Sequence, residues 1–258
     1  MQKVTHSEYI AQKKPLAKQL LAKLNEKYQY ASVLITDNYE KGYRASRSGV
    51  AISATNAFGG KGMIVKVYDG KGYAEYSTNE ITAENLPEIE REIEQQLMNP
   101  ANFIPEGTEE AEYKCISDEP YTLCEATDYE IHPRKVGDEK LIETVTALRE
   151  KAVKADERIL DAITGFNYQE YHKLFLSANR ELEQSVLYST GIMALVAAKG
   201  EEIKQSFRGF SNLGGAELLD KMESAIPQCV KTVTDLLNAE PMEPGTYECV
   251  CTPEVTGM

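Results

Sequence analysis

The sequence predicts an α+β protein built from antiparallel sheets with flanking helices, arranged in two successive helix–sheet–helix passes. Segments whose apolar residues recur every three or four positions predict helices, and they alternate with groups of short apolar runs that predict strands. Turn signals such as Asp69-Gly70 join neighbouring runs directly, which is typical of antiparallel hairpins. Since the helices stand apart from the runs of strands, the pattern indicates the α+β class.

The first pass covers residues 1–98. A helix is predicted from Lys14 to Lys27, because its leucines fall on one side and Pro15 suits a first helical turn. A second helix closes the unit, with apolar residues three and four apart from Leu86 to Leu97. Between the two helices the pattern predicts strands at Ala31–Thr36, Tyr43–Ala54, Met63–Tyr68 and Gly72–Ser77.

Residues 99–137 interrupt the pattern. This segment is rich in proline, glutamate and tyrosine and shows little periodicity. We interpret it as a linker or a long surface excursion, since structureless loops of this length are uncommon inside compact domains.

The second pass covers residues 138–258. Asp138 is predicted to cap a helix that reaches Ala152, and Gly214-Gly215 precedes another helix that contains Pro227. Between these helices a meander of strands is predicted at Ile159–Tyr168, Tyr171–Ser177, Glu181–Thr190, Met193–Lys199 and Glu202–Phe210.

The last residues predict one more strand. Pro244-Gly245 is a turn signal, and Tyr247–Thr252 follows it as a strand candidate. We expect this strand to lead into a further C-terminal domain beyond Met258.

Composition and charge limit the class of protein. The chain holds 41 acidic and 28 basic residues, for a formal charge of −13, which repels phosphate backbones. No run is apolar and long enough to span a membrane, and the first residues lack the apolar core of a signal peptide. We expect a cytoplasmic protein with neither nucleic-acid nor membrane partners.

The five cysteines form no C-x-x-C pair. Cys249 and Cys251 are two residues apart, so on a strand both side chains would point to the same face. A buried reduced pair and one half of a metal site are the two interpretations of this spacing. Reduced, intracellular cysteines fit the whole set best.

No motif for chemistry is present. The three histidines, His6, His132 and His172, have no histidine or cysteine three to five residues away, so we expect none of them to hold a metal. Gly59–Gly62 precedes a strand rather than a helix and is interpreted as a connecting turn, not a phosphate loop. The sequence therefore predicts no catalytic, no cofactor-binding and no metal-ligating residue in this chain.

The chain is rich in tyrosine, with fifteen residues of this type and no tryptophan. Tyrosine offers rigid, amphipathic contact area that suits the binding of extended polypeptide. Half-buried tyrosines on strands are the simpler interpretation, and both remain open at this point.

Three segments together resemble the TldD/PmbA family, also called modulators of DNA gyrase. Ser48–Ser53 with Gly62–Asn79 is similar to the N-terminal signature of that family, and Leu187–Met193 is similar to its Asn-Ser-x-Gly stretch. Tyr188 stands where the family usually has asparagine. Pro244–Gly257 resembles the strand and turn before the metal motif of the TldD-like branch.

The resemblance implies an N-terminal portion of a TldD-like zinc metallopeptidase. In that family a His-Glu-x-x-x-His helix and a later cysteine hold the zinc, and the resemblance places this helix beyond Met258. Zinc is therefore expected in the full-length protein and no cofactor in this chain. The resemblance also implies a dimer with a PmbA-like or identical subunit, and peptides or unfolded polypeptides as substrate.

Two other functions remain as alternatives. The chain could instead come from a non-catalytic, PmbA-like partner subunit, although Thr252–Gly257 favours the catalytic branch. It could also be a stand-alone module that binds peptides or proteins through its tyrosines and its 99–137 segment. In each case the 258-residue chain by itself is expected to be inactive as a peptidase.

Overall fold

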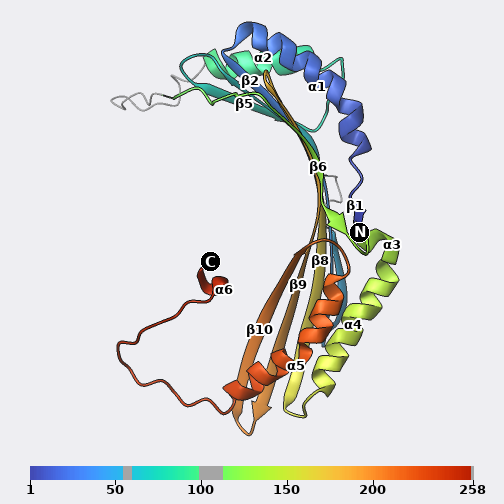
Figure 1. Ribbon diagram of the computed structural model, residues 1–258, viewed down its shortest axis with the longest axis vertical. Helices are drawn as coiled ribbons and strands as arrows, with labels where there is room; N and C mark the ends of the chain where they lie inside the picture. Colours follow the sequence, from blue (N-terminus) through green and yellow to red (C-terminus); the bar gives the residue numbers. More distant parts are fainter. Residues whose placement is uncertain (55–59, 99–112, 257–258) are drawn as a thin grey trace.

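A computed structural model describes residues 1–54, 60–98 and 113–256 of the chain. Its main feature is one eight-stranded sheet, which is bent into an arc (Figure 1). Three long strands of 17, 19 and 20 residues form the centre of this sheet: β2 (Tyr30–Ser46), β8 (Ile159–Ser177) and β9 (Arg180–Lys199). β8 lies between β2 and β9, and these two strands pair with different outer neighbours at their two ends, so the sheet has two halves that share a common centre.

The first half of the sheet adds shorter strands to the central three. β4 pairs with the beginning of β2 and β5 pairs with β4, both antiparallel, whereas β6 runs parallel to the beginning of β9. These strands are β4 (Gly60–Tyr68), β5 (Tyr73–Thr78) and β6 (Tyr121–Ala126).

The second half is extended by β3 (Gly49–Ala54) beside the end of β2 and by β10 (Glu202–Leu213) beside β9. A separate two-stranded ladder joins β1 (Gln2–Lys3) to β7 (Asp128–Tyr129).

The long helices cover one face of the sheet, on the convex side of the arc in Figure 1. One half is covered by α1 (Glu8–Lys27) and α2 (Leu86–Met98), and the other by α4 (Asp138–Lys154) and α5 (Leu218–Leu236). Antiparallel sheet and segregated helices confirm the predicted α+β class. In the described part of the chain, no helix combines the length and the apolarity that crossing a membrane requires.

Two hydrophobic cores lie between the helices and the sheet. In the first, Leu20 of α1 and Ile93 of α2 pack on Val33 of β2. In the second, Val145 of α4 and Met222 of α5 pack on the far ends of β8 and β9. The strand β8 contributes Leu174 and Leu176 to the first core and Phe166 and Tyr168 to the second, because from Ala162 onward its even-numbered side chains point to the helix face.

Several predicted strands are parts of longer ones. Ile159–Tyr168 and Tyr171–Ser177 are one strand, β8, and Glu181–Thr190 and Met193–Lys199 are likewise one strand, β9. Gln169-Glu170 and Gly191-Ile192 suggested breaks, but the antiparallel ladder continues through both, with Gln169 opposite Tyr188 and Gly191 opposite Phe166. Tyr43–Ala54 is instead the end of β2, a turn and β3.

The first helix begins earlier than predicted, at Glu8 rather than Lys14. Ser7 is its N-cap, and the Ser7 Oγ atom accepts a hydrogen bond from the backbone N–H of Ile10 at 3.1 Å. Pro15 therefore lies inside the helix and not in its first turn, because the cap at Ser7 starts the helix seven residues upstream of Lys14.

Asp138 does not cap α4 with its side chain. Gly137 occupies the N-cap position with φ 85°, and no side chain makes the cap hydrogen bond. The Asp138 carboxylate instead accepts hydrogen bonds from Lys41 Nζ at 2.5 Å and Tyr43 Oη at 2.7 Å. It thereby fastens the start of α4 to strand β2.

Within the predicted 99–137 linker, residues 99–112 lie outside the described part of the chain. The rest contains β6, β7 and the short helix α3 (Pro133–Val136), so this part is an element of the fold rather than a connecting segment. Of the Gly59–Gly62 turn, Gly60 and Gly62 belong to β4, and Gly59 is not described.

The predicted strand Tyr247–Thr252 is not a strand in the structure. This segment is exposed and leads to a short helix, α6 (Pro253–Thr256), on the open side of the arc (Figure 1). Cys249 and Cys251 are both exposed, so the buried pair expected from their spacing is wrong. No ladder in the described chain orients them, and alternation of side chains needs a ladder.

Candidate functional site on the concave face of the sheet

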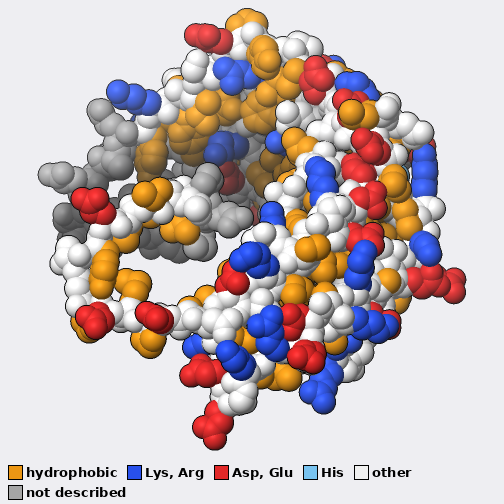
Figure 2. Space-filling view, turned by 60° about the horizontal axis from the view of Figure 1, so that its bottom comes forward, with side chains coloured by type: hydrophobic (Ala, Val, Ile, Leu, Met, Phe, Trp, Pro, Cys, Tyr) orange, Lys and Arg blue, Asp and Glu red, His pale blue; other side chains and the backbone are white. Residues whose placement is uncertain are grey.

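The face of the sheet opposite the helices is concave and rich in apolar side chains. Because Val33 and Ile35 point to the helices, Leu34 between them points to the concave side. The same alternation places Tyr171 of β8, Tyr188 and Ile192 of β9, and Phe207 of β10 on this side. Figure 2 looks into the hollow, where hydrophobic side chains gather on the inner wall.

Several of these side chains are open to solvent. The exposed fraction is 41% for Ile192 and 76% for Phe207, which are large values for apolar side chains in a folded domain. Tyr188 lies directly opposite Leu213 in the β9–β10 ladder. On the other side of Tyr188, its partner in the β8–β9 ladder is Gln169, and Tyr171 is two residues along β8 from Gln169. Such a contiguous apolar surface is typical of a binding site.

The concave face carries little net charge, in contrast to the chain as a whole. The strand registers place four basic residues on it, Arg44, Lys66, Lys173 and Arg180, and four acidic residues, Glu40, Glu75, Glu125 and Asp161. Lys66 and Glu75 neutralise each other in an ion pair. The excess of negative charge therefore lies mainly elsewhere on the protein.

Two glycines make room for large neighbours on this face. A Cβ atom on Gly165 would lie 3.0 Å from the Ile192 side chain, and one on Gly42 would lie 2.0 Å from Asn167 Oδ1. Glycine at these positions lets the Ile192 and Asn167 side chains lie flat across β8 and β2. The floor of the hollow is thereby kept open.

On the opposite, helix-covered face, the structure brings together the three histidines that the sequence separates. His172 Nδ1 lies 2.9 Å from Ser185 Oγ, and the same hydroxyl lies 3.0 Å from His6 Nδ1. His132 Nε2 and His172 Nε2 face the two oxygens of Glu170, at 3.5 and 3.8 Å. This network lies in the strip between the two cores, which we call the waist (Asp37–Lys41, Tyr168–His172 and Glu183–Leu187).

Glu170 is the buried charge at the centre of the waist. Burial acts to raise the pKa of this carboxyl, but the hydrogen bond from His172 and the charges of Arg134 and His132 outweigh it and hold the pKa below its usual range. Burial lowers the pKa of His132, against the opposing attraction of Glu170. The waist therefore holds an ionised carboxylate paired with Arg134, beside the His132 imidazole, whose lowered pKa favours its neutral form.

The combination of Ser185, His172 and Glu170 has the composition of a nucleophilic triad, but its geometry excludes that role. Ser185 is only 1% exposed, so a substrate carbonyl cannot reach its hydroxyl. The three groups instead hold strands β8 and β9 to the N-terminal segment and to α3. Sequence reasoning missed this network because Ser185 is 13 residues from His172 and 179 residues from His6.

The described residues offer no metal site. No group of three or more histidine, cysteine, aspartate or glutamate side chains in this part of the chain converges on a point that could hold an ion. The exposed Cys249 and Cys251 belong to no group of three or more such side chains within the described residues.

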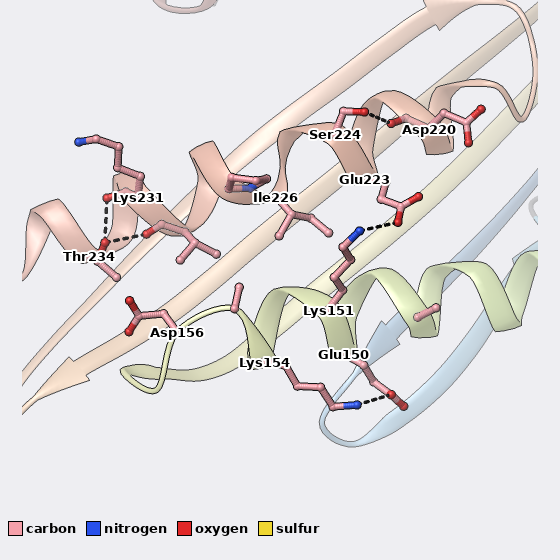
Figure 3. Close-up of a pocket in the computed structure, with 14 residues that line it drawn as sticks. Glu150, Lys151, Lys154, Asp156, Asp220, Glu223, Ser224, Ile226, Lys231 and Thr234 are labelled. Carbon is pink, nitrogen blue, oxygen red and sulfur yellow. Dashed lines mark hydrogen bonds and ion pairs between the residues drawn. The ribbon is translucent and has the colours of Figure 1, made fainter.

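A second hollow is an open groove of about 1310 Å³ between α4 and α5 (Figure 3). Lys151 of α4 and Glu223 of α5 form an ion pair of 2.7 Å across it, and Ile226 and Val230 are among the residues that line it. Several of its other polar groups make contacts within their own helices, as Ser224 does with the backbone carbonyl of Asp220 and Lys231 does with Asp235. The concave face of the sheet is therefore the better candidate for a binding site.

Comparison with known proteins shows which fold this is. No protein-family model matches the chain, and no curated protein is significantly similar to it in sequence. Solved structures do match it, among them two proteins described as putative modulators of DNA gyrase. The one from Bacteroides thetaiotaomicron is 17% identical, with a TM-score of 0.67 over 91% of this chain and 52% of that one.

The protein from Thermotoga maritima is 14% identical, with a TM-score of 0.68 over 90% of this chain and 50% of that one. TldE from Thermococcus kodakarensis is 14% identical, with a TM-score of 0.60 over 85% of this chain and 47% of that one. The chain thus spans about half the length of the solved structures it matches. At these identities the similarity shows the fold, and it is the fold that the sequence motifs indicated.

Proposed function

We propose that this chain is the N-terminal portion of a TldD-like zinc-dependent peptidase, in which the concave face of the sheet encloses peptides or unfolded polypeptides. The observation that carries the proposal is the contiguous, weakly charged apolar surface on that face, on a fold shared with TldE and with modulators of DNA gyrase. Apolar side chains that are buried in folded proteins are accessible in unfolded ones, so such a surface selects unfolded chains.

The role of the chain in this proposal is to hold and enclose the substrate. The described residues do not fit a zinc ion, and so we assign no step of peptide hydrolysis to any of them. The resemblance of Pro244–Gly257 to the segment before the metal motif supports zinc ligands beyond Met258. A PmbA-like or identical subunit completes the proposed enzyme, which we expect in the cytoplasm.

Peptide binding by the chain itself tests the enclosure. Fluorescence anisotropy with a labelled, unstructured apolar peptide should show saturable binding to the 258-residue chain. Ile192→Asp should weaken this binding by about tenfold or more, because it places a charge in the centre of the apolar surface. Leu236→Asp is the matched control, since Leu236 on α5 is 38% exposed but lies on the other side of the sheet.

Two results would refute the enclosure: no binding by the unmodified chain, or equal weakening by both substitutions. The catalytic branch has a separate test in the coding sequence that follows Met258. A His-Glu-x-x-x-His motif there supports the peptidase. Its absence favours the second candidate, a non-catalytic PmbA-like partner that presents the same concave face.

A further inference from the structure

The thiol of Cys124 and the imidazole of His6 lie together at the outer end of the waist. Cys124 is on strand β6, 118 residues from His6 in the N-terminal segment, and its Sγ atom lies 3.6 Å from His6 Nε2. Cys124 is exposed, and the His6 side chain is 37% exposed, so small molecules in solution can reach both groups.

The surroundings of His6 determine which of its ring nitrogens carries the proton. Nδ1 lies 3.5 Å from the Glu183 carboxylate and 3.0 Å from Ser185 Oγ. A carboxylate accepts hydrogen bonds and cannot donate them, so it favours a proton on Nδ1. The unprotonated Nε2 is then the nitrogen that faces the Cys124 thiol.

The far side of the network supports the same assignment. His172 Nε2 faces Glu170, which favours a proton on that nitrogen and leaves His172 Nδ1 as an acceptor. The Ser185 hydroxyl therefore donates to His172 and accepts from His6 Nδ1. Each contact along the network from Cys124 to Glu170 then pairs a donor with an acceptor, and all the donors point the same way.

We propose that Cys124 is a redox-reactive cysteine, with His6 as its base, and that hydroperoxides oxidise it to the sulfenic acid. A thiol beside an imidazole that a carboxylate orients has the arrangement of an activated cysteine nucleophile. The site lies on the helix side of the sheet and does not depend on the proposed peptide binding.

The oxidation consumes one hydroperoxide for each thiol. His6 Nε2 takes the thiol proton, and the Cys124 thiolate attacks one oxygen of the hydroperoxide. The S–O bond forms as the O–O bond breaks, and the leaving alkoxide takes the proton from the His6 imidazolium. The sulfur loses two electrons, the hydroperoxide is reduced to an alcohol, and the sulfenic acid that remains on Cys124 can be reduced again by thiols.

Charged groups around the site stabilise the imidazolium. Glu183 faces His6 from β9 and is itself held by Lys14 of α1 at 2.9 Å. Lys14 and Lys18 also bind Glu181, so the acids beside the site are largely paired with cations of α1. His6 is thus placed to accept the thiol proton, with Glu183 as the counter-charge.

The chain contains thiols that serve as internal controls. Cys115 is also exposed, and among the described residues its Sγ atom has one hydrogen-bond contact, with the backbone carbonyl of its neighbour Ile116. Cys229 is buried on α5, and burial raises the pKa of its thiol. Among the described cysteines, Cys124 is the one with an imidazole beside it.

The test is a limited treatment of the 258-residue chain with hydrogen peroxide near neutral pH, in the presence of dimedone. Peptide mass spectrometry then quantifies the sulfenic acid trapped at each cysteine. We expect Cys124 to be labelled about tenfold faster than Cys115, as is typical of thiols activated by a neighbouring base. In the His6→Asn variant, the labelling rate of Cys124 should fall to that of Cys115.

His132→Asn is the matched control, because His132 contacts Glu170 at the other end of the network and not Cys124. It should leave the labelling of Cys124 unchanged. Equal labelling of Cys124 and Cys115 in the unmodified chain would overturn the proposal. So would rapid labelling of Cys124 that persists in folded His6→Asn protein.

A measurement on the unmodified chain keeps the test independent of how the variants fold. Alkylation by iodoacetamide near neutral pH should be faster at Cys124 than at Cys115. Equal alkylation rates at the two thiols would rule out a base at Cys124.

Discussion

The Glu170 carboxylate on β8 lies 2.7 Å from the Nε atom of Arg134 on α3, where the two hydrophobic cores meet. Arg134 also covers the ring of Tyr39 on β2, 4.0 Å from its centroid. One guanidinium thus joins a helix to two central strands. This contact is the main charged link across the waist.

Removing the Glu170 charge should destabilise the protein. Glu170→Gln leaves Arg134, His132 and His172 without the buried carboxylate that they surround, and we expect a loss of about 1–3 kcal/mol in the free energy of unfolding. Urea unfolding followed by circular dichroism measures it. Glu143→Gln breaks an exposed pair with Lys140 and should cost less than about 0.5 kcal/mol. Equal losses would contradict a structural role for the waist.

Stability should fall as the pH drops below the ordinary pKa of histidine. Because burial lowers the pKa of His132 from 6.5, the unfolded chain binds a proton at this residue that the folded chain does not. The free energy of unfolding therefore decreases as the pH falls through 6.5 toward the lower, folded-state pKa. Urea unfolding at about pH 7.5 and about pH 5.5 should show a smaller decrease for His132→Asn than for the unmodified protein. An identical decrease would contradict the prediction.

The lowered pKa of Glu170 acts in a more acidic range. Its contribution to stability is present above its unfolded pKa of about 4.5 and is lost as the pH falls through the folded-state value. The unfolding midpoint of Glu170→Gln should thus approach that of the unmodified protein at low pH. A difference between the two proteins that stays constant down to low pH would be evidence against this charge effect.

Gly215 should tolerate no side chain. A Cβ atom there would lie 2.0 Å from the backbone carbonyl oxygen of Ile131, which accepts a hydrogen bond from Ala216 at 2.8 Å. Since a backbone atom cannot rotate away as a side chain can, we expect Gly215→Ala to cost about 1–3 kcal/mol. Gly209→Ala on β10 is the control, because its Cβ would meet nothing within 4 Å. Thermal unfolding compares them, and a stable Gly215→Ala protein would refute the close approach.

The N-cap at Ser7, which the sequence analysis did not predict, should contribute to the stability of the protein. Ser7→Ala removes both the cap of α1 and a hydrogen bond of 2.6 Å to Asp37, and we expect a loss of about 1–2 kcal/mol. Ser224→Ala is the comparison, since Ser224 is exposed on α5 and bonds only the carbonyl one turn back. Urea unfolding distinguishes the two, and no loss for Ser7→Ala would argue against the cap.

The sequence was sufficient to predict an element wherever the spacing of its apolar residues matches the set of residues that the fold buries. Leu86, Ile89 and Ile93 are spaced as one face of a helix, and the structure buries them together in α2. It was insufficient at the waist, where Asp37–Lys41 and Gln169–Glu170 look like the ends of strands. Asp37 is satisfied by Ser7 and Glu170 by Arg134, which come from distant parts of the chain, so no local pattern predicts that the strands continue.

The sequence by itself determined the α+β class, most helices and the family resemblance, because hydrophobic spacing and turn residues act over a few positions. Only the tertiary structure decided that His6, His132 and His172 share one network, and that Tyr171 and Tyr188 line a common concave face. The physical reason is the pairing of strands: the ladder register places side chains side by side that the sequence separates. Contacts of that kind are set by the whole fold and leave no spacing to recognise.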